Sequence, residues 1–112
     1  MSQDQAVAPG LEGVVLASAL VDYQPGTVVS RTLVRKPAGT VTAFAFDAGE
    51  GLSEHTAPFD ALALNLEGEA DISIAGTLYR LSAGQLLKLP AGQAHAVKAI
   101  TPFKMLLVMI KA

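Results

Sequence analysis

Two histidines, His55 and His95, are the side chains of this sequence best suited to metal binding or acid–base chemistry. The sequence contains no cysteine, which excludes a disulfide framework and thiolate chemistry. Each histidine stands near a proline-containing turn, where a strand is expected to begin or end. If the two strands are antiparallel neighbours, both rings come within reach of one metal ion, because imidazole is a common ligand of Zn, Fe, Ni and Cu. The alternative is a purely structural role for each ring.

The stretch that leads to the second histidine has a well-defined order of turns. Residues 84–95 hold a glycine turn, a short apolar run, a Pro-x-Gly turn and then His95. An apolar run of this length between glycine and proline is typical of a buried strand. His95 therefore begins the next strand, at the mouth of a barrel or sandwich, where a side chain can point to the interior.

Short strands are expected along most of the chain, and no helix longer than a turn or two. Glycine-containing turns separate them at intervals of about ten residues, which favours an all-β sandwich or barrel. The expected strands cover residues 27–35, 40–47, 52–55, 60–66, 69–74, 77–81, 84–89, 95–100 and 103–110.

The 112 residues fit a single domain with its own core. Residues 27–112 are expected to form the β-barrel domain. Residues 1–26 precede it, with a loose tail over residues 1–10 and a first strand, docking arm or helical turn over residues 13–21.

Charge and hydropathy argue against several classes of partner. The net charge is −2 and there is no basic run, so a nucleic-acid partner is not expected. No apolar run approaches the ~20 residues of a membrane span, so no membrane association is expected. The N-terminus lacks the basic-then-apolar pattern of a signal peptide, which predicts a cytoplasmic location.

The apolar content of the chain suggests an interface. Hydrophobic residues make up 51% of the sequence, and residues 40–47 are apolar on both faces, with small residues opposite Phe44 and Phe46. A strand of this kind is usually covered on both sides. In a chain of this size the second cover is expected to come from a partner subunit, so we predict a homodimer.

Residues 84–95 resemble the second conserved motif of the cupin superfamily, G-x5-P-x-G-x2-H-x3-N. Gly84, Pro90, Gly92 and His95 are in register, and Ala99 stands in the place of the final asparagine. Cupins also contain a first motif, G-x5-H-x-H-x3,4-E-x6-G, which residues 51–68 resemble more loosely. The resemblance extends from about residue 27 to the C-terminus and implies a small antiparallel jelly-roll β-barrel.

Many cupins bind a divalent metal at the barrel mouth through three histidines and one glutamate. Of these four places, His55 and His95 fill the first and last. The second histidine place is Ala57, and the glutamate place falls on Ala61 or Leu62. The resemblance thus implies a metal site in which two of the usual ligands are missing.

The nearest spare carboxylate is Asp60, one residue before the shorter-spacing glutamate place. Its chemistry suits a metal, but a one-residue shift along a regular strand reverses the face to which a side chain points. An irregular turn after Pro58 would remove that restriction. The predicted metal set is therefore His55, His95 and Asp60.

Three interpretations of the function follow. In the first, the predicted metal set holds a divalent ion (Zn, Fe, Ni or Mn) with open positions for a small organic ligand, as in a dioxygenase or isomerase. In the second, the metal is weakly bound or absent, the barrel binds or senses a small molecule, and the two histidines contact the ligand or act as acid and base. In the third, both histidines are remnants and the role of the protein lies in its interface.

Three further residues are candidates for the wall of a ligand pocket. Phe59 is the strongest, because it is a large apolar side chain next to the predicted site. Tyr79 lies on the return strand of a hairpin, from which its ring can enter the pocket. Gln93 lies between the Pro-x-Gly turn and His95, where its amide either reaches a ligand or faces water.

Overall fold

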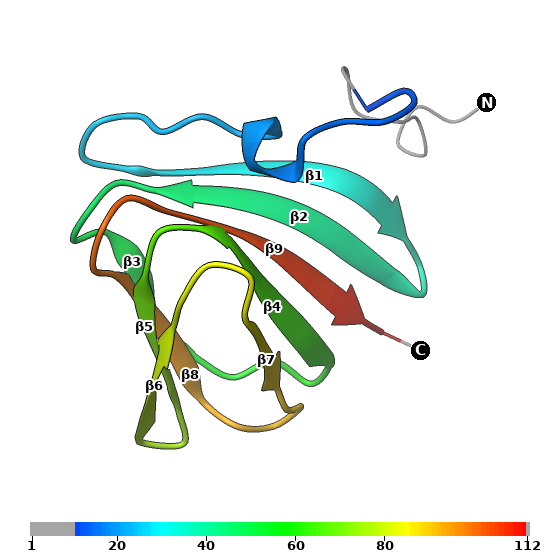
Figure 1. Cartoon of the computed structure of the whole chain (residues 1–112). Helices are drawn as coiled ribbons and strands as arrows, with labels where there is room; N and C mark the ends of the chain where they lie inside the picture. The colour runs from blue at the N-terminus through cyan, green and yellow to red at the C-terminus, as the bar shows by residue number, and fades with distance from the viewer. Residues whose placement is uncertain (1–10, 112) are drawn as a thin grey trace.

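The computed structural model describes residues 11–111, and the tail expected over residues 1–10 lies outside this range. The chain folds into two facing antiparallel sheets (Figure 1). Nine strands form them: β1 (Val28–Lys36), β2 (Gly39–Phe46), β3 (Gly51–His55), β4 (Asp60–Glu67), β5 (Ala70–Ile74), β6 (Thr77–Leu81), β7 (Leu86–Leu89), β8 (His95–Ala99) and β9 (Phe103–Ile110).

The first sheet has the order β1-β2-β9-β4-β7 and the second the order β3-β8-β5-β6. Every strand pair is antiparallel. Sequence neighbours such as β2 and β3, or β7 and β8, lie in different sheets, so the chain crosses repeatedly between the layers. This is the jelly-roll arrangement, and it confirms the all-β barrel predicted from the sequence.

Alternation along the strands fills the space between the sheets. In β4, Ala61 and Ala63 are buried while Leu62 is exposed. Phe46 on β2 and Phe103 on β9 belong to the same sheet and are fully buried, with 5.3 Å between their ring centroids. In the facing sheet, Ile72 on β5 is also fully buried. The inner faces therefore form one apolar core, as period-two patterning requires.

The outer face of the first sheet is partly covered by the N-terminal segment of the same chain. Ala17–Ala19 form a single 3-10 turn, labelled η2, rather than a strand. Leu20 and Val21, which follow this turn, are buried against β1 and β2. The doubly apolar β2 thus gains part of its second cover from residues 11–23, while the homodimer remains a prediction.

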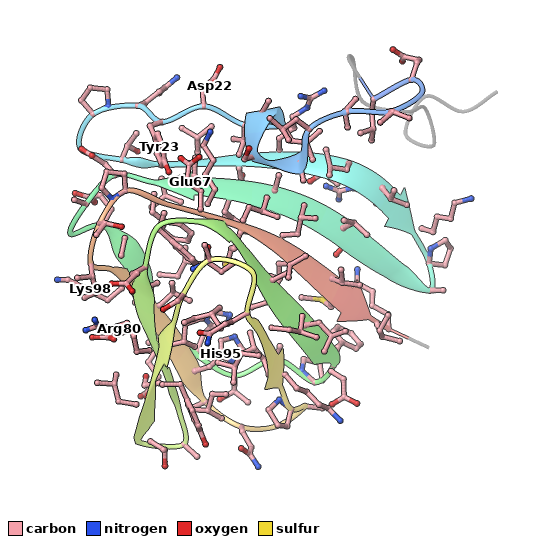
Figure 2. All side chains as sticks on the ribbon, in the orientation of Figure 1. Asp22, Tyr23, Glu67, Arg80, His95 and Lys98 are labelled. Carbon is pink, nitrogen blue, oxygen red and sulfur yellow. The ribbon has the colours of Figure 1, made fainter. Side chains whose placement is uncertain are left out.

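Polar anchors hold this segment in place. Lys104 on β9 is only 7% exposed, and its Nζ donates a hydrogen bond to the Ser18 carbonyl at 2.6 Å. The Tyr23 hydroxyl donates to Glu67 Oε2 at 2.5 Å. Figure 2 shows Tyr23 and Glu67 on the outer side of the first sheet, whereas His95 lies on the second sheet. The anchors and the histidines therefore belong to different regions of the molecule.

No helix within residues 11–111 is long and apolar enough to cross a membrane.

Candidate functional site

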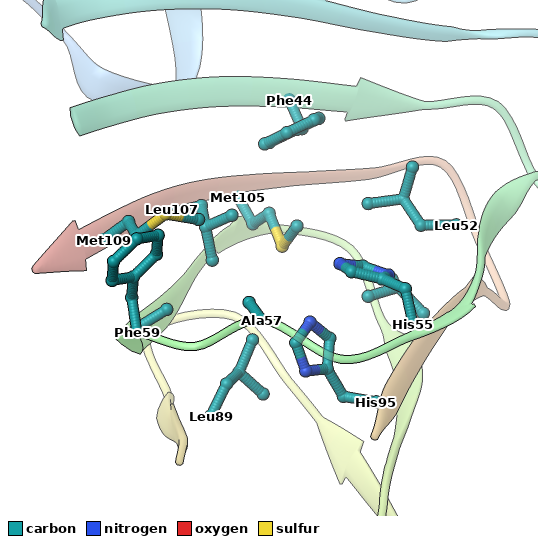
Figure 3. A pocket seen from close by; sticks show the side chains of 12 residues that line it. Phe44, Leu52, His55, Ala57, Phe59, Leu89, His95, Met105, Leu107 and Met109 are labelled. Carbon is teal, nitrogen blue, oxygen red and sulfur yellow. The ribbon is translucent and has the colours of Figure 1, made fainter. Parts of the chain in front are cut away.

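The site is organised around the pair of histidines. β3 and β8 are antiparallel neighbours, and His55 is the register partner of His95. Their ring centroids are 4.4 Å apart and the rings meet edge to face at 68°. The structure therefore brings together two residues that are forty positions apart in sequence (Figure 3).

An irregularity in β3 gives His55 its direction. In a regular strand, Leu52 and His55 would point to opposite faces, because side chains alternate. The register with β8 shifts between these two residues, as at a β-bulge. Both side chains consequently line the same pocket.

Both imidazoles are oriented by backbone carbonyls two residues earlier. His55 Nδ1 lies 3.1 Å from the Ser53 carbonyl oxygen, and His95 Nδ1 lies 3.4 Å from that of Gln93. A carbonyl oxygen only accepts hydrogen bonds, so each Nδ1 carries the proton and donates it. In the neutral form, each Nε2 then offers a lone pair, and the far end of each ring extends into the pocket (Figure 3).

The electrostatic environment keeps His95 neutral. His95 is 9% exposed, and this burial lowers its pKa below the usual value for histidine. The neighbouring His55 lowers the pKa of His95 further, while the hydrogen bond to the Gln93 carbonyl partly offsets both effects.

This shift predicts how stability depends on pH. In the unfolded chain His95 takes up a proton near its ordinary pKa of 6.5, but in the folded chain it does so only at lower pH. The free energy of unfolding should therefore fall as the pH drops from 7.5 to 5, with a slope from this group of at most ~1.4 kcal/mol per pH unit. Urea denaturation across this range checks it. His95→Gln should flatten the slope, and an unchanged slope in that variant would contradict the assignment to His95.

The two histidines stand at one side of a pocket of about 280 Å³ between the sheets (Figure 3). The first sheet contributes six apolar residues to its wall: Phe44, Ala61, Leu89, Met105, Leu107 and Met109. The second sheet and the β3–β4 loop contribute Leu52, His55, Ala57, Phe59, His95 and Val97. Ten of the twelve lining residues are apolar, so the histidine rings are the polar groups of the wall.

The structure places Asp60 away from the pocket. Asp60 is exposed, and its Oδ1 accepts a hydrogen bond from the Ala91 backbone N–H at 2.8 Å. Since β4 alternates regularly from its first residue, Ala61 faces inward and Asp60 outward. The carboxylate thus connects β4 to the turn before His95.

The missing metal ligands are replaced by methyl groups. Ala57 and Ala61 line the pocket beside the histidines, whereas Leu62 points outward. Of the two possible glutamate places, the pocket-facing one is therefore Ala61. Within residues 11–111, no three His, Cys, Asp or Glu side chains lie close enough together to hold a metal ion.

The three candidates for the pocket wall have different positions. Phe59 lines the pocket. Tyr79 is the register partner of the buried Ile72, but it is 43% exposed on the edge strand β6 and does not line the pocket. The Gln93 side chain is exposed in the turn, and its backbone carbonyl is the group that contacts His95.

Three wall residues on the last strand are expected from the sequence to fill the core instead. Met105, Leu107 and Met109 share one face of the last strand, and this pattern predicts core filling. That face does point inward, but it forms the wall of the pocket. Alternation identified the face, and only the space between the sheets shows that it remains partly open.

A family described as the cupin domain matches residues 43–110. The chain is a cupin. The match covers both histidines, and the family and fold predicted from the sequence are confirmed.

Several solved structures are similar to this cupin. A conserved protein of unknown function from Streptococcus pyogenes is 36% identical over 90% of this chain and 89% of its own, with a TM-score of 0.86. A cupin superfamily protein from Desulfitobacterium hafniense is 30% identical over 96% and 98%, also with a TM-score of 0.86. A cupin 2 conserved barrel domain protein from Leptotrichia buccalis is 40% identical over 84% of this chain and 46% of its own, with a TM-score of 0.81. No curated protein matches this cupin.

Proposed function

We propose that this cupin binds a small, mostly apolar organic molecule in the pocket between the sheets, with His55 and His95 as its polar contacts and no resident metal ion. The observation that carries the proposal is the lining, in which ten apolar side chains surround two adjacent imidazoles. Small-molecule sites commonly combine an apolar wall with a few polar groups that fix orientation. The volume of about 280 Å³ lies just below the usual range of such sites, which favours a small ligand.

The donor set does not fit the metal site that the cupin resemblance implies. Catalytic zinc sites use three protein ligands and structural sites use four. Here two imidazoles stand beside the methyl groups of Ala57 and Ala61, and the Asp60 carboxylate is bonded to the Ala91 N–H outside the pocket. The binding of Zn, Fe, Ni or Mn is therefore not part of the proposal.

Catalysis is not part of the proposal either. Within residues 11–111, the pocket wall contains no carboxylate, hydroxyl or amine side chain to act together with the histidines. A binding or sensing role needs only the apolar wall and the two ring nitrogens. The homodimer and the cytoplasmic location remain predictions from the sequence.

A titration with a small hydrocarbon tests the proposal. We expect ethylbenzene, followed by NMR of the 15N-labelled protein, to bind saturably and to shift the amides of β3, β8 and β9 whether or not EDTA is present. Elemental analysis of untagged protein should find well under one divalent ion per chain. The proposal would be wrong if no saturable binding occurred, or if stoichiometric metal were present and were lost in the His55→Ala, His95→Ala double variant.

A further inference from the structure

The hydrogen bonds of the histidine pair restrict the chemistry of the ligand. Both Nδ1 atoms are already used, since each donates to a backbone carbonyl, those of Ser53 and Gln93. Each neutral ring then has one remaining polar atom, Nε2, which only accepts hydrogen bonds. The polar end of the pocket thus consists of two acceptors, and the group that pairs with them must be a donor.

The other side chains of the wall supply no hydrogen-bond donor. Apart from the histidines, all the lining side chains are apolar, so a carboxylate placed there would lose its water without gaining a partner. One wall residue contacts a cation: the Nζ of Lys111 lies 5.9 Å from the centroid of the Phe59 ring. Lys111 is exposed, so water and salt screen its charge.

The burial of His95 also argues against an anionic ligand. An imidazole that is 9% exposed and beside a second imidazole is disfavoured in its charged form. The lowered pKa of His95 agrees with this. At neutral pH His95 therefore presents a lone pair rather than the positive charge that would attract an anion.

We infer that the ligand of this pocket is a neutral molecule with an apolar body and a hydroxyl group, of the phenol or alcohol class, whose O–H donates to Nε2 of His55 or His95. The inference rests on the proposed function, which it narrows from apolar molecules in general to hydroxyl donors. A hydroxyl group has one O–H donor. Because each ring offers one acceptor, this O–H can pair with either ring but not with both. A ligand with two hydroxyl groups could pair with both.

Three probes of nearly the same shape test this inference at pH 7.5. They are 4-ethylphenol, 4-ethyltoluene, in which a methyl group replaces the hydroxyl, and 4-ethylbenzoate, in which a carboxylate replaces it. We expect 4-ethylphenol to bind about tenfold more tightly than 4-ethyltoluene, because the Nε2 acceptor of the buried His95 would otherwise be left without a partner. The carboxylate should bind more weakly than both.

The His55→Leu, His95→Leu double variant should remove the preference for 4-ethylphenol over 4-ethyltoluene. The control variant Gln93→Ala should keep it, because the Gln93 backbone carbonyl, not its side chain, orients His95. The three probes on the unmodified protein decide the question even if the double variant does not fold.

Each outcome of the probe comparison has a distinct meaning. Equal binding of 4-ethylphenol and 4-ethyltoluene would overturn the hydroxyl inference and leave the proposed function intact. Binding of 4-ethylbenzoate at least as tight as that of 4-ethylphenol would also overturn it, and would show that the pair binds anions. If none of the three probes bound saturably, the proposed function would fail together with the inference.

Discussion

Ala61→Phe is expected to weaken the binding of 4-ethylphenol or ethylbenzene at least ~30-fold, a loss of about 2 kcal/mol. Ala61 is 5% exposed and its methyl group forms part of the pocket wall. A benzyl group at this position occupies the space in which the ligand would lie. Because the side chain enters an existing pocket rather than a filled core, we expect the free energy of unfolding to change by about 1 kcal/mol or less. Isothermal titration and urea denaturation measure the two quantities.

The adjacent residue provides a matched control for this substitution. Leu62 lies next to Ala61 on β4 but points outward and is 36% exposed. Leu62→Phe should leave probe affinity within about twofold of the unmodified protein. Equal losses in the two variants would mean that the probe does not bind between the sheets. Unchanged affinity in Ala61→Phe would exclude the pocket as the binding site.

Most of the fold could be predicted from the sequence, because its strands are separated by strong turn signals. The hairpin across Ala75 and Gly76 illustrates this, since both residues adopt positive φ (49° and 86°), as a tight two-residue hairpin turn requires. The sequence leaves residues 13–21 open between a strand and a helical turn, because their apolar residues suit both. In the structure, this segment packs on the outer face of the first sheet and contains a short 3-10 turn.

The site could be predicted only in part, and the reasons are local. Strict alternation would place Leu52 and His55 on opposite faces. The irregularity in β3 that brings both side chains to one face has no clear signature in the sequence. The face to which Asp60 points depends on where regular alternation resumes after Pro58. Because β4 begins at Asp60 itself, Asp60 points outward and Ala61 inward. Tyr79 points to the same face as Ile72, but its strand lies at the edge of its sheet. The order of strands in a sheet cannot be read from period-two patterning.

Gly68→Ala is expected to destabilise the fold by about 3 kcal/mol or more. Gly68 has φ +82°, which costs a residue with a side chain ~1 kcal/mol. A Cβ atom at this position would also lie 1.9 Å from the Pro102 carbonyl oxygen, so the backbone of one of the two turns must move. Urea denaturation monitored by circular dichroism measures the loss. The glycine that closes the first cupin motif thus has a physical reason here, namely close contact with the turn between β8 and β9.

Gly76→Ala separates the two causes, because Gly76 has φ +86° but no atom within 4 Å of its Cβ position. We expect it to lose only the ~1 kcal/mol that the left-handed backbone costs. Similar losses in the two variants would show that the contact with Pro102 contributes nothing.

Gly68 follows the last residue of β4, at the end opposite the β3–β4 loop that contributes Ala57 and Phe59 to the pocket. Below its melting temperature, Gly68→Ala should therefore bind the probes with unchanged affinity, because the turn that secures the barrel and the pocket that binds the ligand are at different ends of the same strand.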